Sequence, residues 1–461
     1  LNIYKEKNFF HWELEFPEIF YKENYKKENP GFDVVIGNPP YVRQEKITEQ
    51  KPVYKILYPK VYTSTADLAV YFVKRSLDLT KWGGYHSFII TNKWVRAKYG
   101  ENLRNYLTEK IKINEIVDFT GVEVFIGATV DVLIYILKNV KPQDNKLKYC
   151  DYKDFSLQHI KKYVKKSSFD IEQEILKQGW NFYPKEILEI KKKIEKVGKP
   201  LKEWDVKIKF GIKTGFNKAF LINKKTKEQL IKKDAKNVEI IKPILRGRDI
   251  GRYSYDWKNL YLILAKNGIN IPEEYPTIYK HLLKWEGQLK KRWDQGDYWY
   301  NLRHCSYYED FEKPKIVWQE IVREPRFYYD NQFYQEATCF LMTGKDLKYL
   351  LAILNSKPAT IFFRAFYAGG GLGEEGYRYK KVFLERLPIV QLSEPQQKPF
   401  IELVDKMLVL NKQLKETKDD LEEKVKIEKE IRETDKEIDK LVYELYGLTN
   451  EEVKIVEKVI K

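Results

Sequence analysis

A short apolar run that ends in Asn-Pro-Pro-Tyr constrains this chain most. Residues 32–36 are mostly apolar without regular alternation, which predicts a strand buried on both faces. Gly37 permits a sharp turn after that strand, and two prolines then restrict the backbone. Asn38 and Tyr41 are therefore expected on a stiff loop at the carboxyl edge of a sheet, where open α/β sheets bind ligands. A plain proline turn after a core strand is the alternative interpretation.

Asn-Pro-Pro-Tyr resembles the catalytic motif of DNA amino-methyltransferases, which transfer a methyl group to adenine N6. In that interpretation the Asn38 amide oxygen and the Pro39 carbonyl accept the two N–H bonds of the adenine amino group. The nitrogen lone pair then turns towards the methyl donor, so that positioning and hydrogen bonding supply most of the catalysis. The base must leave the duplex to be reached, and Tyr41 is placed to stack on it. Asn38, Pro39 and Tyr41 are thus the predicted catalytic residues.

Residues 1–140 alternate between strand and helix patterns. Helices are predicted at 66–80 and at 101–110, and a Gly83-Gly84 pair is expected to end the first of them. Strands are predicted at 85–90, 113–119 and 130–137. This order indicates an α/β fold with a mostly parallel sheet. The resemblance implies that residues 1–140 are the C-terminal part of a methyltransferase catalytic domain, with a partial Rossmann-like sheet.

The rest of the chain divides by composition. Residues 141–199 are Lys-rich and less periodic, and we expect a bridging segment. Residues 200–390 mix short strands, turns and aromatic-basic clusters, which predicts a second, mixed α/β domain. Residues 391–461 carry apolar positions at roughly heptad spacing among alternating charges. They predict a helical hairpin or bundle, with a free coiled coil as the alternative.

The resemblance to adenine methyltransferases extends beyond the motif. Residues 64–72 are similar to the family segment behind the methyl-donor pocket, which implies cofactor contacts from Asp67 and Phe72. Residues 98–104 are similar to the stretch where such enzymes place a second aromatic ring against the base, which makes Tyr99 the second stacking residue. An ordinary loop tyrosine is the alternative, because the chain contains 34 tyrosines.

The second half resembles target-recognition domains of Type IIG restriction–modification enzymes, through residues 210–220, 244–250, 349–356 and 438–448. Basic residues beside glycines or aromatic rings are the predicted DNA contacts: Lys213, Lys218, Arg246, Arg248, Arg323, Arg326 and Arg378. A glycine-rich stretch at 369–376 is expected to be a DNA-facing loop, and residues 327–329 a stacking surface. An ordinary surface role is the alternative for each residue.

The charge balance agrees with a nucleic-acid partner. The chain has 84 Lys and Arg against 67 Asp and Glu, a net charge of +17, with 15% aromatic residues. Such a chain is typical of a binder of double-stranded DNA, although a Lys- and Glu-rich thermophilic surface is an alternative. Three widely spaced cysteines predict neither a disulfide framework nor a metal site. Neither a signal peptide nor an apolar run of membrane length is found, so we expect a cytoplasmic protein.

One departure from the family concerns the cofactor. Such enzymes bind S-adenosylmethionine on a glycine-rich loop that precedes Asn-Pro-Pro-Tyr, and residues 1–37 contain no such loop. The chain also begins with Leu1, and its only methionines are Met342 and Met407. We therefore expect an incomplete S-adenosylmethionine site and a missing N-terminal half as partner, with or without a nuclease domain.

These observations predict site-specific, S-adenosylmethionine-dependent adenine-N6 methylation of DNA within a restriction–modification system. Two alternatives stay open: a non-catalytic DNA-binding specificity module, and the modification and specificity part of a bifunctional restriction endonuclease. Methylation of RNA or protein is a weaker alternative, because the large basic second domain favours DNA.

Overall fold

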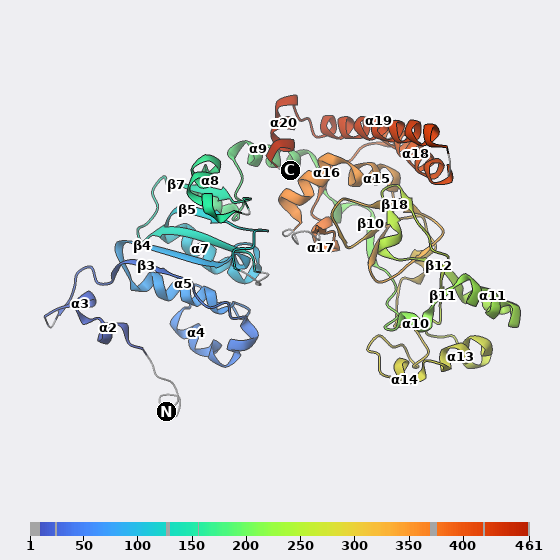
Figure 1. Ribbon diagram of the computed structural model, residues 1–461, viewed down its shortest axis with the longest axis horizontal. Coiled ribbons are helices and arrows are strands. Elements are labelled where there is room, and N and C mark those ends of the chain that lie inside the picture. The colour runs from blue at the N-terminus through green and yellow to red at the C-terminus, as the bar shows by residue number, and fades with distance from the viewer. Residues whose placement is uncertain are drawn as a thin grey trace. The chain divides into compact units, whose positions relative to one another are not determined.

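The computed structural model of this 461-residue chain describes residues 10–23, 25–125, 130–154, 156–368, 376–417 and 420–459. The chain divides into two compact units, Leu1–Leu188 and Glu189–Lys461, and the boundary falls within helix α9 (Lys185–Val197) (Figure 1). Within the described ranges, no helix combines the length and the apolar character needed to span a membrane. The same ranges contain no group of three or more His, Cys, Asp or Glu that could hold a metal ion.

A six-stranded sheet forms the centre of the first unit. Its strands stand in the order β3 (Phe32–Gly37), β4 (Thr80–Thr91), β6 (Val132–Lys138), β5 (Lys112–Asp118), β7 (Lys146–Asp151) and β8 (Phe169–Glu172). β3 pairs with β4, and β5 with β7, in parallel. β6 runs antiparallel to β4 and β5, and β8 antiparallel to β7. The sheet is mixed, and not mostly parallel as predicted, because β6 follows β5 along the chain and pairs with it directly.

Helices cover both faces of this sheet, which confirms the α/β fold class. Helices α5 (Leu68–Leu79) and α7 (Glu101–Lys110) share one core with side chains such as Phe88 and Tyr135. Helix α8 (Ile160–Ser167) packs on the other face, against Val117 and Cys150. The smaller elements of this unit are α2 (Trp12–Glu15), α3 (Pro17–Phe20), β1 (Tyr21–Lys22), β2 (Tyr25–Lys26), α4 (Lys51–Leu57) and α6 (Lys93–Arg96).

Strand β3 lies at an edge of the sheet, with β4 as its neighbour among the described strands. Val35 packs against the core below α5, whereas Val34 is 59% exposed and Ile36 is 79% exposed. The prediction that residues 32–36 are buried on both faces was therefore wrong. An apolar run specifies a strand, but it does not specify what lies on either side of it.

The Gly83-Gly84 pair lies inside β4 and does not end the preceding helix. Helix α5 ends at Leu79, and β4 begins at the next residue. Gly83 has a φ of +84°, a conformation that favours glycine. A Cβ on Gly84 would lie 2.9 Å from the carbonyl oxygen of Asp33 in β3. The two glycines thus allow a close approach between two strands.

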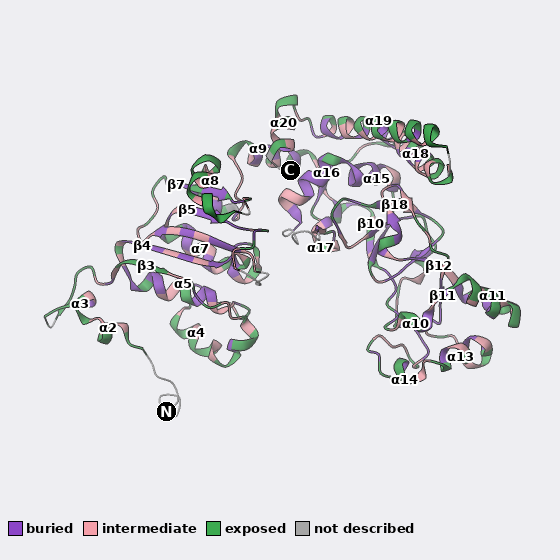
Figure 2. Ribbon diagram, viewed as in Figure 1, coloured by how far each residue is buried: buried purple, intermediate pink, exposed green. Residues whose placement is uncertain are grey.

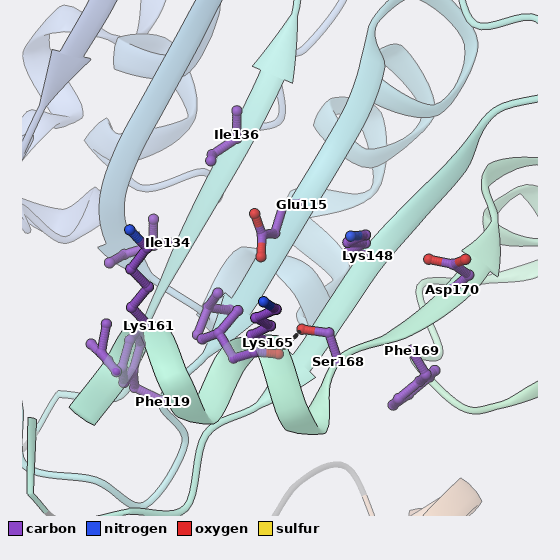
Figure 3. Close-up of a pocket in the computed structure, with 13 residues that line it drawn as sticks. Glu115, Phe119, Ile134, Ile136, Lys148, Lys161, Lys165, Ser168, Phe169 and Asp170 are labelled. Atoms are coloured by element: carbon purple, nitrogen blue, oxygen red, sulfur yellow. Dashed lines mark hydrogen bonds between the residues drawn. The ribbon is translucent and has the colours of Figure 1, made fainter.

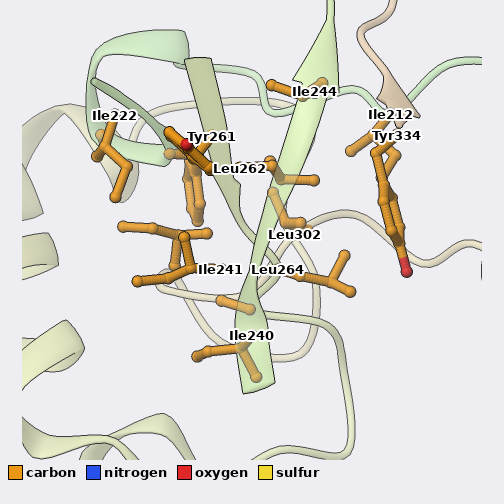
Figure 4. Packing of buried hydrophobic residues seen from close by; sticks show 14 of the residues in the cluster. Ile212, Ile222, Ile240, Ile241, Ile244, Tyr261, Leu262, Leu264, Leu302 and Tyr334 are labelled. Carbon is orange, nitrogen blue, oxygen red and sulfur yellow. The ribbon is translucent and has the colours of Figure 1, made fainter. Parts of the chain in front are cut away.

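The second unit contains two four-stranded sheets. The first has the order β10 (Val206–Phe210), β20 (Cys339–Gly344), β16 (Lys315–Gln319) and β18 (Phe327–Asp330). The second has the order β11 (Leu221–Asn223), β15 (Leu260–Ile263), β12 (Ile241–Leu245) and β19 (Tyr334–Gln335). Figure 4 shows the core around this second sheet, a cluster that extends from Ile222 through Leu262 and Ile244 to Tyr334. Helices α10 (Asn217–Phe220), α11 (Lys224–Lys233), α13 (Pro276–Leu283) and α14 (Glu286–Leu289) belong to the same unit.

Helices dominate the end of the chain. α15 (Leu347–Asn355) and α16 (Lys357–Phe362) are largely buried, and α18 (Glu394–Glu416) and α19 (Leu421–Leu445) pack beside each other and against them. Figure 2 shows the outer faces of α18 and α19 exposed to solvent. α20 (Asn450–Val459) follows. In the first unit, β7 and β8 come from residues 141–199, so part of the expected bridging segment belongs to the sheet.

Candidate functional site

The Asn-Pro-Pro-Tyr segment forms the loop that follows β3. Asn38 is exposed, Pro39 is buried, and Tyr41 is half-buried. The Tyr41 hydroxyl donates to the carbonyl of Ile89, near the end of β4, at 3.4 Å, and burial raises the pKa of that hydroxyl. Because β3 and β4 are parallel, the loop lies at the carboxyl edge of the sheet. None of the described residues hydrogen-bonds the Asn38 side chain, so its amide is open to a ligand.

Asp67 fastens this loop to helix α5. Its Oδ1 accepts a hydrogen bond from the backbone N–H of Gln44 at 2.8 Å. The next N–H, that of Leu68, donates to the carbonyl of Val42 at 3.1 Å. The carboxylate expected to contact the methyl donor thus also positions the loop. Phe72, the other cofactor candidate, lies on α5 and is exposed.

Tyr99 comes to the same region from another segment of the chain. Its carbonyl accepts a hydrogen bond from Thr63 Oγ1 at 3.1 Å. Burial raises the pKa of the Tyr99 hydroxyl, and the neighbouring Asp67 carboxylate raises it further. The ring packs against the same core as Tyr41. The structure therefore gathers Tyr41, Asp67 and Tyr99 at one edge of the sheet.

A ring that the sequence analysis did not single out, Phe125, lies against Tyr41. The two ring centroids are 6.3 Å apart, with an angle of 60° between the planes. Phe125 belongs to the segment after β5, and β5 is parallel to β3 and β4, so this segment starts at the same edge of the sheet. The sequence signal was an aromatic residue between two predicted strands, which is too common to identify a site.

Asp118, at the end of β5, holds the start of the segment that carries Phe125. Its Oδ1 accepts hydrogen bonds from the Thr120 backbone N–H at 3.0 Å and from the Thr120 hydroxyl at 2.7 Å. Asn92, which follows β4, donates to the same oxygen at 3.2 Å and to Thr120 Oγ1 at 2.6 Å. The Arg96 guanidinium lies 3.9 Å from Asp118 Oδ2. This polar network ties the ends of β4 and β5 together beside the Asn-Pro-Pro-Tyr loop.

A cavity of about 710 Å³ lies in the first unit, between α8 and the sheet. Figure 3 shows Glu115, Ile134 and Ile136 on the sheet side, and Lys161 and Lys165 on the helix. None of its lining residues belongs to the Asn-Pro-Pro-Tyr loop. The cavity and the candidate catalytic edge are therefore separate.

In the second unit, the two arginines around Gly247 differ in their surroundings. Arg246 Nε donates to Asp249 Oδ2 at 2.9 Å, and Arg246 Nη2 donates to Asp249 Oδ1 at 2.8 Å. These hydrogen bonds are the main reason that the pKa of Arg246 is raised. Arg248 is exposed, and no described carboxylate pairs with it. Of the two, Arg248 has the guanidinium that is free to contact a phosphate.

The glycine turn at residues 213–218 presents Lys213 and Lys218 to solvent. Thr214 Oγ1 donates to Asn217 Oδ1 at 2.5 Å within this turn. Gly215 has a φ of +67°, which favours glycine. The two predicted DNA contacts in this turn are thus exposed on an ordered backbone.

Strand pairing brings together the remaining basic candidates. β17 (Ile321–Val322) pairs with β21 (Tyr377–Arg378). Arg378 lies in β21, and Arg323 directly follows β17. Both arginines are exposed, and so is Arg326. Of the glycine-rich stretch at 369–376, residues 369–375 lie outside the described residues. The expected stacking surface at 327–329 needs correction, because Phe327 is buried in strand β18 of the first sheet.

Comparison with known proteins gives two family matches. Residues 1–125 match the Eco57I restriction-modification methylase family, and residues 242–389 match the TaqI-like C-terminal specificity domain. The first match contains the Asn-Pro-Pro-Tyr loop, Asp67, Tyr99 and Phe125. The second contains Arg246 and Arg248.

Individual proteins are similar to this chain over both of these regions. The Type II methyltransferase M.BstVI of Geobacillus stearothermophilus is 25% identical, over 98% of this chain and 79% of its own length. The Type II methyltransferase M.XhoI of Xanthomonas vasicola is 24% identical, over 78% of this chain and 68% of its own length. The solved structure of the Type IIL restriction-modification enzyme MmeI in complex with DNA has a TM-score of 0.61 at 15% identity. That match covers 92% of this chain and 56% of MmeI, and it shows that the two share a fold.

Proposed function

From the premise that this chain is a methyltransferase of the restriction–modification type with a specificity domain, we propose that it methylates adenine N6 at specific DNA sites. The observation that carries this proposal is the Asn-Pro-Pro-Tyr loop: the Asn38 amide is exposed, unpartnered among the described residues, and set beside Tyr41 at the carboxyl edge of the sheet. An amide oxygen on a fixed loop is suited to accept a hydrogen bond from an amino group.

The chemistry asks mainly for positioning. Two acceptors, the Asn38 amide oxygen and the Pro39 carbonyl, hold the amino N–H bonds and leave the nitrogen lone pair directed at the donor. Proline has no backbone N–H, so neither Pro39 nor Pro40 adds a donor that would compete with the adenine amino group for these two oxygens. S-adenosylmethionine, when bound, supplies a methyl group on a sulfonium that is a good leaving group. The residues of this chain therefore orient the amine and need not include a strong base.

We propose that the cofactor site is completed by strands that pair at the exposed edge of β3. Among the described strands, β3 has a neighbour on one side, and its side chains Val34 and Ile36 leave an apolar patch on one face of the sheet that further elements would cover. The helix N-terminus and glycine-rich loop that hold such a cofactor would come with these strands. Asp67 and Phe72 would border the pocket from α5, with Asp67 Oδ1 also holding Gln44. This arrangement makes an upstream methyltransferase segment, with or without a nuclease domain, the expected partner.

Titration calorimetry tests the cofactor proposal. We expect the 461-residue chain alone to release no measurable heat with S-adenosylmethionine. Addition of the polypeptide encoded immediately upstream, fused or as a separate chain, should restore both cofactor binding and methylation of DNA. Tight cofactor binding by the chain alone would contradict the incomplete site. Cofactor and DNA binding without methylation, even with the upstream segment present, would favour the non-catalytic specificity module.

Two rings compete to be the partner of Tyr41 in holding an extruded adenine. We propose Tyr99, which shares the Asp67 region with the loop, and we use Phe125 as the comparison because its ring lies against Tyr41. With 2-aminopurine at the target base, Tyr41→Ala and Tyr99→Ala should each weaken base binding by about 1–3 kcal/mol, whereas Tyr→Phe variants should retain it. If Phe125→Ala weakens binding and Tyr99→Ala does not, Phe125 is the second ring.

We propose that the second unit reads the DNA, mainly through residues 200–390. Lys213, Lys218, Arg248, Arg326 and Arg378 are exposed there, and the whole chain carries a net charge of +17. Arg246, tied to Asp249, is suited to shaping the loop that presents Arg248. Exposed cations neutralise phosphates and position a protein on a duplex without reading sequence. Double-stranded DNA is therefore the substrate that this surface fits best.

A further inference from the structure

A fully exposed tryptophan, Trp293, stands in the turn at residues 290–295 of the second unit. Two other tryptophans of this unit, Trp204 and Trp318, are buried, and Trp257, Trp285 and Trp299 are partly buried. A tryptophan ring exposes a large apolar area to water, and burying it on a partner would be favourable. Exposure of one ring does not by itself define a binding site. The residues around Trp293 determine whether it belongs to one.

The turn that carries Trp293 is held in place by its own hydrogen bonds. The Gln295 side chain donates to the carbonyls of Lys290 at 2.9 Å and Arg292 at 2.6 Å. The Gln295 backbone N–H donates to the carbonyl of Trp293 at 3.0 Å. The exposed indole therefore projects from an ordered backbone, and binding would order little more than its side chain.

Arg292, next to Trp293, anchors this turn to the rest of the unit. Its guanidinium is buried, donates to the Trp299 carbonyl at 3.0 Å, and also donates to the carbonyls of Thr214 and Asn301. It lies 4.6 Å from the centre of the Phe220 ring. Arg292 thus donates its hydrogen bonds to carbonyls within the protein. It connects its own loop to the glycine turn that contains Lys213.

The two loops are in direct contact. A Cβ on Gly215 would lie 3.1 Å from Arg292 Cδ and 3.1 Å from Asp294 Cβ. The two contacting loops therefore both carry exposed lysines, Lys213 and Lys218 on one and Lys290 and Lys291 on the other. Lys290 pairs with Glu286 at 2.8 Å, but Lys213, Lys218 and Lys291 form no ion pair with any carboxylate in the described ranges.

We propose that Trp293 and the unpaired Lys213, Lys218 and Lys291, together the Trp293 tip, form a contact surface for duplex DNA. The lysines bind phosphates, and the indole inserts as a wedge at a base step that opens in the bound duplex, where it stacks on the unstacked base. An apolar ring on loops that carry three unpaired lysines, next to an Asp294 that pairs with Arg303 at 3.0 Å, fits a polyanion with π-faces better than it fits an apolar protein surface. The contact does not depend on sequence, because every base has such a face. The proposal rests on DNA reading by the second unit.

The test uses the full chain and a fluorescein-labelled duplex of mixed sequence, titrated at several salt concentrations. Trp293→Ala should weaken binding by about 5- to 150-fold, and Trp293→Phe should keep most of the affinity. The slope of log affinity against log salt should not change in either variant, because stacking releases no counterions. Arg248→Ala serves as the phosphate comparison, and it should reduce that slope by about 0.9. Trp82→Ala is the matched control, since Trp82 is 62% exposed in the first unit.

Three outcomes are distinguishable. Loss of affinity in Trp293→Ala at unchanged slope, with Trp82→Ala and the thermal midpoint unaltered, supports the stacking contact. Wild-type affinity in Trp293→Ala, while Arg248→Ala lowers the slope, overturns the Trp293 tip but leaves DNA reading intact. Absence of DNA binding by the unaltered chain at low salt overturns both this inference and the proposed reading function.

Discussion

Replacement of Asn38 by alanine is expected to lower methyl transfer by about 10²–10³-fold, the usual effect of removing one preorganised hydrogen-bonding group at a reacting centre. Asn38 lies exposed on a loop whose neighbours fix it: Pro39 is buried, Tyr41 is bonded to Ile89, and Gln44 is held by Asp67. Truncation therefore removes the acceptor without unfolding the loop. Its interaction with the amine strengthens as the nitrogen becomes tetrahedral, so the loss should appear in kcat.

The measurement is the incorporation of labelled methyl groups into duplex DNA by the chain, supplied with the methyltransferase segment proposed to complete its cofactor site. DNA affinity should stay within about twofold of the unaltered protein, because a lost transition-state contact leaves ground-state binding nearly unchanged. Asn331→Ala, at an exposed asparagine of the second unit, is the matched control and should retain activity. Near-normal turnover in Asn38→Ala would contradict the catalytic role proposed for the loop.

Replacement of Asp330 by alanine is expected to destabilise the second unit by about 3–5 kcal/mol, the range measured when one partner of a buried ion pair is removed. Lys315 Nζ lies 3.0 Å from Asp330 Oδ2, and both side chains are fully buried. Asp330 also accepts hydrogen bonds from Gln335 Nε2 at 2.7 Å and from the Gln332 N–H at 2.9 Å. The variant would leave a buried cation and several donors unsatisfied.

Denaturant unfolding, followed by tryptophan fluorescence, measures this effect. The control is Asp205→Ala, which breaks an exposed pair with Lys345 and should change stability by at most about 1 kcal/mol. Combined Lys315→Met and Asp330→Leu substitutions should recover much of the loss, because the uncompensated charge is then absent. Equal effects of Asp330→Ala and Asp205→Ala would show that the buried pair contributes little.

Local patterns predicted local structure well. The spacing of apolar residues predicted the helix at Glu101–Lys110 and the strands β5 and β6 to within two residues at each end. Glycine and proline placed the turn after β3. These features depend on a few consecutive residues, so the sequence alone contains the necessary information.

Features that depend on distant residues could not be predicted. The exposure of Val34 and Ile36 depends on what packs on their face of the sheet, and an apolar run does not specify that. The contact of Phe125 with Tyr41 arises because β5 runs parallel to β3 across two intervening strands. Phe327 lies beside two arginines in the sequence but enters a sheet whose other strands come from residues 206–344. Arg246 was equivalent to Arg248 by sequence, and the two differ in the structure because Arg246 donates to Asp249 whereas Arg248 is exposed.

The division of the chain into two units places the two proposed roles in separately packed parts of the chain. Asn38, Tyr41, Asp67, Tyr99 and Phe125 all lie before residue 188, and every proposed DNA-reading residue lies after it. Each set is supported by hydrogen bonds within its own unit. Substitutions of the exposed cations in the second unit are therefore expected to change how tightly the protein binds DNA, while the methyl-transfer site keeps its geometry. Exchange of residues 189–461 as one block is accordingly expected to change how the protein binds DNA and to leave Asn38, Tyr41 and Asp67 in place.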